Sequence, residues 1–372
     1  MSRFLQRKIN TIFIMLGNSC NMNCAYCLQH PLVHSPLSAE VNPEIYDFIS
    51  EVAKDNGPGG VHLQFYGGEP LLYFSSIKKI VEETKDRNIS CTYSVISNGR
   101  AITDEMVEFF NAQEMPVTIS WDGPNVLETR GFDVFADAVM RKRLLSIRQL
   151  GLSGVISAKA YPMELLDAFQ AISDEYRKIH GYQVRINLDE IFDTGIAARD
   201  LLAVDYERVA REMHELTKLY LENFVGGEKS ESEYTKIMYI EGFFQQLSRF
   251  ICQNNGEWNR FTAACGNGLT VLNMDLDGKL YHCHNTSKAA GTIHTPFFEY
   301  LQRILAEDKT SVHREGCLEC PALAFCQGGC KLVGEQAREE TYCKLKRAVF
   351  VPVISVFEQY GAQVLGSDVN GA

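Results

Sequence analysis

The chain has 372 residues, of which 45% are hydrophobic, so it can fill the core of one large domain with a smaller companion. Its formal net charge of −11 argues against a polyanionic partner such as DNA or tRNA, because phosphate binding needs clustered Lys and Arg. With 12 cysteines, the chain is too long to be a disulfide-stapled secreted module, and most of these thiols are expected to bind metal as thiolates.

The N-terminal segment carries positive charges, but the apolar run behind it, Ile12 to Leu16, stops at Gly17. This run is too short for a signal peptide or a membrane span. We therefore expect a cytoplasmic protein in a reducing compartment, with no membrane partner. The acidic net charge adds the expectation that there is no nucleic-acid partner.

Residues 12 to 190 alternate short β-branched or aromatic runs with stretches of helical periodicity, which is the pattern of βα units around a parallel sheet. The expected strands are Ile12–Leu16, Val61–Tyr66, Cys91–Ser97, Val117–Ser120, Gly154–Lys159 and Tyr182–Leu188. The expected helices are Pro43–Lys54, Ser75–Arg87, Thr103–Ala112, Phe132–Leu150 and Met163–His180. The pattern predicts an α/β fold built as a partial, TIM-like (β/α)6 barrel, with functional groups at the carboxyl ends of the strands.

Cap residues mark the ends of some of these helices. Ser75 and Thr103 are expected N-caps, and Gly151 and Gly181 are expected stops. Two further helices, Tyr206–Phe224 and Tyr234–Cys252, are expected to connect two domains.

Three cysteines, Cys20, Cys24 and Cys27, follow the first strand within one short loop. A mononuclear zinc site or a fully protein-ligated cluster needs a fourth ligand, and none lies nearby in the sequence. The trio therefore suits a 4Fe-4S cluster with one open iron, which a small chelating ligand can occupy. A zinc knuckle or cysteines placed by chance is the alternative.

The spacing Cys-x3-Cys-x2-Cys, with Tyr26 before the third cysteine, resembles the radical S-adenosylmethionine (SAM) superfamily. The resemblance implies that SAM chelates the open iron through its amino and carboxylate groups. One electron then cleaves SAM into methionine and a 5′-deoxyadenosyl radical, which abstracts hydrogen from the substrate. An external one-electron donor of the flavodoxin or ferredoxin type is implied as a partner.

Glycine-rich or polar turns follow the next three strands. Gly67-Gly68-Glu69-Pro70 matches the family motif that holds the methionine amino group of SAM. The later strand ends resemble the family's contacts to the ribose and aminoacyl parts of SAM, and the residues concerned are Ser97, Asn98, Ser120 and Asp122. Turn chemistry alone also favours such residues. Arg185 shares a strand face with Asn187 and could touch the substrate or the SAM carboxylate, or the pair could simply be satisfied by neighbouring backbone.

A second set of cysteines lies near the C-terminus. Its members are Cys265, Cys283, Cys317, Cys320, Cys326, Cys330 and Cys343. Asp277-Gly278 between two apolar runs predicts a hairpin that brings the first two of these cysteines near each other. This array resembles the SPASM domain, the auxiliary-cluster module of radical SAM maturases.

The SPASM resemblance implies two auxiliary 4Fe-4S clusters and thus three clusters in all. One would use Cys265, Cys283 and Cys330, and the other Cys317, Cys320, Cys326 and Cys343. Cys252 either completes the first auxiliary cluster or is a helix-end core thiol that leaves an iron open. The implied domains are a radical SAM core at 1–204, a helical connector at 205–260, a SPASM domain at 261–345 and a C-terminal helix or tail at 346–372.

This architecture resembles enzymes that modify ribosomally made peptides or proteins. We expect hydrogen abstraction from a peptide and formation of a carbon–carbon or thioether cross-link, with oxidation through the auxiliary clusters. The alternatives are an anaerobic sulfatase-type maturase that forms formylglycine, a radical SAM enzyme acting on a small molecule, an Fe-S electron carrier with a vestigial SAM site, and a zinc-bound scaffold.

The general base and the means of substrate recognition are less well marked. Sulfatase maturases generally place an aspartate after the second SPASM cysteine, where this chain has His284, and the candidate bases are His282, His284, Asp275 and Asp277. Because few residues precede the first strand, an N-terminal leader-binding module is not expected. Peptide capture is then assigned to a separate recognition protein, to the barrel mouth or to the connector helices at 205–253.

Overall fold

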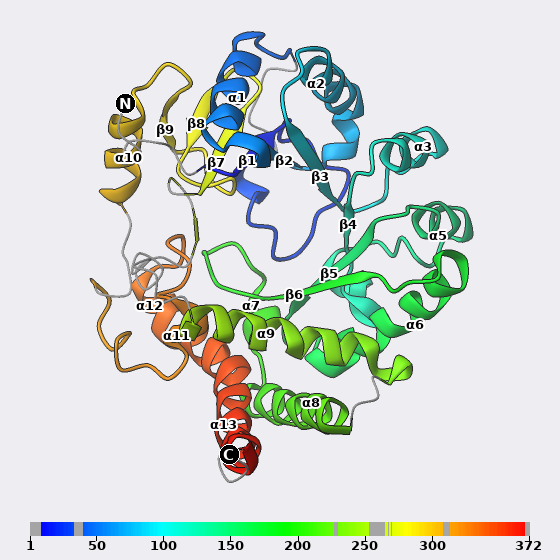
Figure 1. The fold of residues 1–372 in the computed structure, drawn as a ribbon, viewed down its shortest axis with the longest axis vertical. Coiled ribbons are helices and arrows are strands. Elements are labelled where there is room, and N and C mark those ends of the chain that lie inside the picture. Colours follow the sequence, from blue (N-terminus) through cyan, green and yellow to red (C-terminus); the bar gives the residue numbers. More distant parts are fainter. Residues whose placement is uncertain are drawn as a thin grey trace. The chain divides into compact units, whose positions relative to one another are not determined.

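The computed structural model describes residues 9–32, 40–226, 230–252, 265–266, 268, 270–307 and 313–368 (Figure 1). The chain divides into two units. The first comprises Met1–Trp121, Arg130–Leu152 and Cys265–Asp308, and the second comprises Asp122–Thr129, Ser153–Ala264 and Lys309–Ala372.

A mostly parallel sheet forms the centre of the first unit, with the strand order β4-β3-β2-β1-β7-β8-β9. Its strands are β1 (Thr11–Met15), β2 (Val61–Tyr66), β3 (Cys91–Ser97), β4 (Val117–Ser120), β7 (Val271–Asp275), β8 (Lys279–Tyr281) and β9 (Ala289–Thr292). Strands β1 to β4 pair in parallel, β7 pairs in parallel with β1, and β8 and β9 are antiparallel additions. The segment that carries the C-terminal hairpin therefore extends the N-terminal sheet.

The register of β1 explains why it lies inside this sheet. Ile12 and Ile14 are fully buried and stand beside apolar residues of β2 on one side and of β7 on the other. A parallel strand that is buried inside a sheet typically has a continuous run of apolar residues in its sequence, as β1 does. The helices α1 (Glu44–Asp55), α2 (Phe74–Asp86) and α3 (Asp104–Ala112) lie along the outer side of β1 to β4 (Figure 1).

Sequence pattern and observed elements agree well for the first four strands, because β2, β3 and β4 have the predicted bounds and β1 is displaced by one residue. The helix predicted at Phe132–Leu150 is wrong, since only α5 (Ala138–Leu145) forms there. Asp137 caps α5 by accepting hydrogen bonds from the backbone N of the second and third residues of the helix. The rest of that stretch is turn and the start of β5.

The predicted caps have mixed outcomes. Thr103 caps α3 by accepting from Met106 N, and Gly181 ends its helix in the left-handed conformation, so both predictions are confirmed. Ser75 does not cap α2, because a 3-10 turn runs directly into the helix at Phe74. Gly151 does not stop a helix, since it lies within β5 (Leu150–Ile156).

In the second unit, β6 (Arg185–Glu190) lies next to β5, and both strands differ by a few residues from their predicted bounds. The helices of this unit are α4 (Val126–Thr129), α6 (Pro162–His180), α7 (Arg199–Leu202), α8 (Tyr206–Gly226), α9 (Tyr234–Cys252), α11 (Leu323–Cys326), α12 (Glu335–Ala337) and α13 (Cys343–Asp368). The two predicted connector helices are therefore present as α8 and α9.

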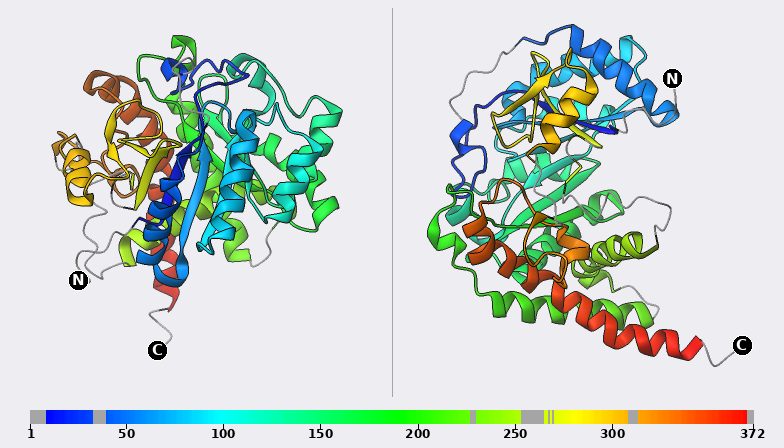
Figure 2. Two further views of the ribbon diagram at one scale, coloured as in Figure 1. Left: turned by 90° about the horizontal axis from the view of Figure 1, so that it is seen from above. Right: turned by 90° about the vertical axis from the view of Figure 1, so that its left-hand side faces the viewer.

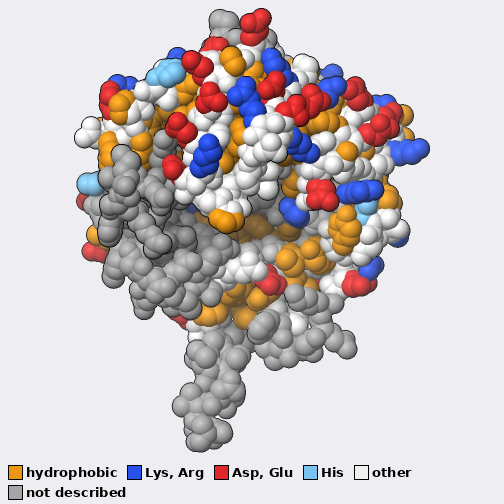
Figure 3. All heavy atoms as spheres, turned by 45° about the horizontal axis from the view of Figure 1, so that its top comes forward, with side chains coloured by type: hydrophobic (Ala, Val, Ile, Leu, Met, Phe, Trp, Pro, Cys, Tyr) orange, Lys and Arg blue, Asp and Glu red, His pale blue; other side chains and the backbone are white. Residues whose placement is uncertain are grey.

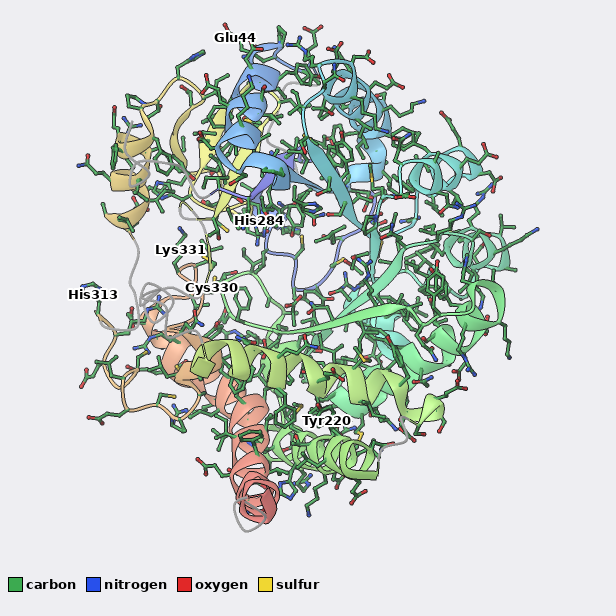
Figure 4. All side chains as sticks on the ribbon, viewed as in Figure 1. Glu44, Tyr220, His284, His313, Cys330 and Lys331 are labelled. Atoms are coloured by element: carbon green, nitrogen blue, oxygen red, sulfur yellow. The ribbon has the colours of Figure 1, made fainter. Side chains whose placement is uncertain are left out.

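Packing in the second unit joins its long helices. Thr235 donates a 2.8 Å hydrogen bond from Oγ1 to Leu166 O, which fixes the start of α9 on α6. Tyr220 of α8 stacks on Phe244 of α9 with ring centroids 4.8 Å apart (Figure 4). Helices α8 and α13 run side by side (Figure 2). No helix in the described part of the chain is long and apolar enough to cross a membrane.

The elements together form an α/β fold with an open, parallel-stranded sheet. This confirms the predicted partial barrel.

Candidate functional site

The three-cysteine loop, residues 17–27, is joined to the end of β2 by backbone hydrogen bonds. Gly68 N donates to Gly17 O at 2.9 Å, and Glu69 N donates to Ser19 O at 2.9 Å. These bonds continue the pairing of β1 with β2 beyond the ends of both strands. The loop that carries the cysteines is thus held at the carboxyl edge of the sheet.

Gly67 and Gly68 leave no room for a side chain at this junction. A Cβ on Gly67 would lie 2.4 Å from Gly17 O, and the residue has a φ of +149°. A Cβ on Gly68 would lie 2.4 Å from Ser19 O. Because both obstructing atoms belong to the backbone, the glycines are what allow the loop to lie against β2.

Glu69 joins the ends of β2 and β3. Its Oε1 accepts hydrogen bonds from Ser97 Oγ at 2.6 Å and Leu71 N at 2.9 Å, and its Oε2 accepts from Asn98 N at 2.8 Å. Burial raises the pKa of Glu69, while these three hydrogen bonds oppose the rise. The carboxylate therefore fixes two strand ends relative to each other.

Asn98 continues this network into the three-cysteine loop. Its Nδ2 donates to Asn21 Oδ1 at 2.8 Å and lies 3.8 Å from Cys20 Sγ. The next charged residue, Arg100, donates from a guanidinium nitrogen to Asn21 O at 2.6 Å. The Ser97-Asn98-Gly99 turn thus orients the first cysteine of the loop.

A pocket of about 430 Å³ opens beside the loop, lined by residues 20–23, Arg100 and residues 130–132. Arg130 is only 8% exposed, and its guanidinium lies over the ring of Tyr26 at 5.3 Å from the centroid. The guanidinium of Arg100 lies 4.6 Å from the ring centroid of Phe132. The pocket is therefore bordered by thiol, amide and cationic groups.

The thiols of this loop respond to burial and to nearby charge. Burial raises the pKa of Cys27, and hydrogen bonds from the backbone of Gln29 and His30 and the charge of Arg130 oppose the rise. Burial also raises the pKa of Cys20. A metal must therefore displace the proton from these thiols when it binds.

Ser120 and Asp122, the remaining predicted SAM contacts, follow β4. Ser120 is half-buried at the last position of the strand. Asp122 belongs to the second unit, where it is fully buried and its Oδ1 accepts a 3.0 Å hydrogen bond from Val155 N. Asp122 thus supports the β5 backbone, and the SAM contacts of both residues stay predictions.

The predicted hairpin is formed by β7 and β8. Gly278 adopts a φ of +83° in its turn, and the buried Asp275 accepts from Tyr281 Oη at 2.6 Å and from Lys279 N at 2.9 Å. Asp277 is exposed in the turn. The carboxylate of Asp275 therefore stabilises the hairpin.

His284, next to Cys283, packs among aromatic rings in the first unit (Figure 4). Its ring stacks on Phe13 at 4.4 Å and meets the edge of Tyr66 at 4.7 Å, and burial lowers its pKa to about 4. Gln29 Nε2 donates a 2.7 Å hydrogen bond to His284 O. The ring is uncharged at neutral pH, and the backbone beside Cys283 is tied to the segment that follows the three-cysteine loop.

The candidate base His282 and the predicted substrate or SAM contact Arg185 lie in different surroundings. His282 is buried, with its Nδ1 3.9 Å from Glu307 Oε2. Arg185 is exposed on β6 in the second unit, on the same face as Asn187, whose Nδ2 donates to Asp189 Oδ2 at 3.0 Å. Their proposed roles stay predictions.

Four cysteines of the C-terminal array interact within the second unit: Cys317, Cys320, Cys326 and Cys343. Burial raises the pKa of Cys326 to about 11, and of the charges around it Lys346 lowers that pKa while the other three thiols raise it further. Four thiols whose charges interact in this way fit a shared iron–sulfur cluster. Bound iron would compensate the negative charges of the four thiolates, which otherwise repel one another.

The first implied auxiliary set draws Cys265 and Cys283 from the first unit and Cys330 from the second. Cys265 is exposed, Cys283 is buried and Cys330 is half-buried. The side chain of Cys252 lies outside the described residues. Whether these residues share a cluster stays a prediction.

In the part of the chain that the structure describes, no three His, Cys, Asp or Glu side chains are grouped so as to hold a metal ion. The finding concerns one ion, whereas a cubane cluster binds each thiolate to a different iron. The cluster predictions are therefore not tested by it.

Residues 14–140 match the radical SAM superfamily. The chain carries a radical SAM domain. Its three-cysteine loop, the Gly67–Glu69 turn and the Ser97-Asn98 turn all lie within the matched residues.

Relatives and solved structures extend this finding. The radical SAM cyclopropyl synthase TigE of Paramaledivibacter caminithermalis is 29% identical over 134 residues, which are 32% of this chain and only 28% of TigE. The structure of anSMEcpe with bound AdoMet is 17% identical and covers 94% of this chain and 98% of its own, with a TM-score of 0.67. Streptococcus suis SuiB bound to its precursor peptide SuiA is 13% identical and covers 87% of this chain and 72% of its own, with a TM-score of 0.58. The chain therefore shares the fold of anSMEcpe and SuiB.

The residues of the radical SAM domain fit a 4Fe-4S cluster and SAM. Three thiols on one loop leave one iron of a cubane without a protein ligand, and the adjoining pocket offers space and two arginines beside it. Arg100 and Arg130 were missed by the sequence reasoning. Arg100 follows the Ser97-Asn98-Gly99 turn directly, which was a usable signal, whereas Arg130 lies just before the wrongly predicted helix.

Proposed function

We propose that the chain is a radical SAM maturase that abstracts hydrogen from a ribosomally made peptide and installs a carbon–carbon or thioether cross-link. The observation that carries this proposal is the three-cysteine loop, held by Gly67–Glu69 and Asn98 beside a pocket in a radical SAM domain. The shared fold with SuiB, which was crystallised with a precursor peptide, supports a peptide as the substrate class.

When bound, SAM and the loop's cluster would supply a 5′-deoxyadenosyl radical that takes one hydrogen atom from the substrate. The chain's own residues position these groups. Cys20, Cys24 and Cys27 would hold three irons, and Asn98 orients Cys20 and its neighbour. Arg130 and Arg100 give the pocket two positive charges, which suit a carboxylate better than a neutral group.

Cross-linking removes two hydrogen atoms from the peptide. The 5′-deoxyadenosyl radical would take the first hydrogen atom, and the second hydrogen atom would be lost as a proton and an electron. The proton needs an acceptor, and the electron needs a one-electron oxidant. We assign the oxidant role to the auxiliary clusters of the SPASM array, and the external reductant that starts the reaction to a flavodoxin- or ferredoxin-type protein. We place the reaction in the cytoplasm and assign leader recognition to a separate protein.

The proposal is tested with anaerobically reconstituted protein, dithionite and SAM. We expect 5′-deoxyadenosine from the wild type and none from the variant with Cys20, Cys24 and Cys27 all changed to alanine. Cys91→Ala is the matched control, because Cys91 is a half-buried thiol at the start of β3 and outside both arrays. Undiminished 5′-deoxyadenosine from the triple variant would refute the proposal, as well as the radical chemistry of the domain.

A formylglycine-forming maturase is the second candidate, because a cysteine-type anaerobic sulfatase-maturating enzyme of Clostridium novyi is 25% identical over 114 residues, which are 29% of this chain. His284 weighs against it, since a ring with a pKa of about 4 is a weak proton acceptor at neutral pH. Mass spectrometry of a candidate peptide distinguishes the two: loss of two hydrogen atoms with no aldehyde indicates a cross-link, whereas an aldehyde that reacts with hydrazide indicates formylglycine. A small-molecule substrate would leave every candidate peptide unchanged while 5′-deoxyadenosine still forms.

A further inference from the structure

Arg338 lies against two cysteines of the four-cysteine set in the second unit. One guanidinium nitrogen is 3.9 Å from Cys317 Sγ and 3.8 Å from Cys343 Sγ. The residue is only 5% exposed. A buried cation this close to two thiols is a charged donor aimed at sulfur.

The local backbone explains this position. Residues Arg338–Tyr342 form a turn of π-helix between the short α12 and the long α13, which begins at Cys343. A π-helical turn brings residue i over residue i+5, so Arg338 and Cys343 stand on the same side. Such turns are uncommon and recur at functional sites.

A second contact fixes the guanidinium. Its Nε donates to Glu335 Oε2 at 2.8 Å, and the Glu335 side chain is 46% exposed. The carboxylate therefore lies toward solvent and is partly screened, while the sulfur-facing nitrogen stays buried. The guanidinium is thus held on one edge and presents another edge to the thiols.

The other buried cations near this set have different partners. Arg314 donates to Gly328 O at 2.7 Å and so holds the loop between two cysteines. Lys346 Nζ pairs with the half-buried Glu190 at 2.6 Å, so its charge is matched by a carboxylate in a similarly enclosed place. Arg338 is the cation among these three with a nitrogen within 4 Å of cysteine sulfurs, whereas Arg314 and Lys346 act on Cys317 and Cys326 through their charge.

A 4Fe-4S cluster with four thiolate ligands is negatively charged, and adding an electron makes it more so. Hydrogen bonds to the sulfurs and nearby positive charge stabilise the reduced state and raise the reduction potential. We infer that Arg338 is a positioning residue that sets the potential of the second auxiliary cluster, the one ligated by Cys317, Cys320, Cys326 and Cys343. The effect makes this cluster a better electron acceptor.

This inference rests on the proposed auxiliary cluster, and its test reads the cluster itself. The full chain is used, with Cys20, Cys24 and Cys27 changed to alanine to remove the signal of the first cluster. Reduction is followed by dithionite titration with electron paramagnetic resonance detection, in the absence of SAM and peptide. Iron and sulfide are counted in every variant.

We expect Arg338→Gln to lower the equilibrium constant for one-electron reduction of one cluster at least ten-fold, a shift of 59 mV to more negative potential. Arg338→Lys, which keeps the charge, is expected to shift less. Glu335→Gln removes the opposing carboxylate and is expected to shift the potential in the positive direction. Lys344→Gln is the matched control, because it removes one exposed positive charge next to Cys343 and is expected to change nothing measurable.

Two results would overturn the inference. The first is an Arg338→Gln variant that keeps its cluster with a potential equal to that of Lys344→Gln. The second is a Glu335→Gln variant whose reduction potential moves in the negative direction or does not change. If Arg338→Gln loses its cluster, the Glu335→Gln variant alone tests the inference. If the wild type binds no cluster through these four cysteines, the auxiliary-cluster proposal itself fails, and iron counting distinguishes that failure from the others.

Discussion

At the ends of β2 and β3, single residues decide how the three-cysteine loop is held. Gly68 lets the loop backbone pass at contact distance, and Glu69 ties the two strand ends together through hydrogen bonds to Ser97, Leu71 and Asn98. A substitution at either position would therefore displace the loop that carries the cysteines, although neither residue is a cysteine itself. Both roles hold whether or not SAM also contacts these residues.

Gly68→Ala is the sharpest test of this arrangement. Its Cβ would lie 2.4 Å from Ser19 O, so the loop must shift, at a cost of about 1–3 kcal/mol in the free energy of unfolding. We expect anaerobic reconstitution to lose the iron of one cluster, about a third of the proposed total. Gly59→Ala is the control, since nothing lies within 4 Å of its Cβ. Equal iron in both variants would contradict the role of Gly68.

His62 gives a pH-dependent prediction. Burial on β2 lowers its pKa from 6.5, so the folded protein takes up its proton at lower pH than the unfolded chain. The stability that the uncharged His62 contributes is therefore fully present above about pH 6.5, the pKa of the unfolded chain, and is lost as the pH falls below that value. We expect His62→Gln to reduce the fall in melting temperature of the metal-free protein between neutral and mildly acidic pH. His294→Gln, at an exposed site, is the control; an unchanged pH profile for His62→Gln would count against the prediction.

At the scale of elements, periodicity identified the strands whose residues are buried by their neighbours. β2, β3 and β4 have the predicted bounds because their apolar residues alternate or run together within one sheet. The sequence also indicated the three-cysteine loop, because its chemistry lies in consecutive residues. These features depend on local spacing, which a sequence displays directly.

The helix predicted at Phe132–Leu150 fails because of one local turn and one contact between residues farther apart in the sequence. Asp133 Oδ1 accepts a 3.0 Å hydrogen bond from Trp121 Nε1 and a 2.9 Å bond from Phe135 N, which favours a turn where periodicity favoured a helix. Arg130 was also missed, because its guanidinium lies over Tyr26, a residue far away in the sequence, and no local spacing reveals that contact. Likewise, the pairing of β7 with β1 joins residues far apart in the sequence, and no local pattern reveals it.

The two predicted N-caps offer a paired test at this scale. Thr103 Oγ1 accepts from Met106 N at 3.2 Å, so Thr103→Ala is expected to cost about 1 kcal/mol in the stability of the first unit. Ser75→Ala is expected to leave stability unchanged or slightly increased, because Ser75 is an exposed residue inside α2 and caps nothing. Denaturant titration of the metal-free variants measures both. Equal losses would show that the hydroxyl of Thr103 does not act as a cap.

For the whole molecule, charge and composition set limits on partners. Acidic and basic side chains are interspersed on the upper part of the face shown in Figure 3. The formal charge of −11 adds a general repulsion toward polyanions. The two arginines of the pocket are a local exception to this acidic balance.

The division of chemistry between the units gives the last prediction. The three-cysteine loop lies in the first unit, and the four-cysteine set lies in the second. If the second set carries only the oxidation step, its removal should leave the cleavage of SAM intact and abolish the cross-link. We therefore expect the variant with Cys317, Cys320, Cys326 and Cys343 all changed to alanine to form 5′-deoxyadenosine without the two-hydrogen loss in the peptide.

The control for this variant is the triple alanine variant of the three-cysteine loop, which should form neither product. Metal-thiolate bonds can also hold a segment folded, so the melting temperature of the quadruple variant is measured as well. A quadruple variant that keeps its fold but loses 5′-deoxyadenosine and cross-link together would contradict a purely oxidative role, because the four-cysteine set would then act before hydrogen abstraction. A variant that still forms the cross-link would show that the electron leaves the substrate by another route.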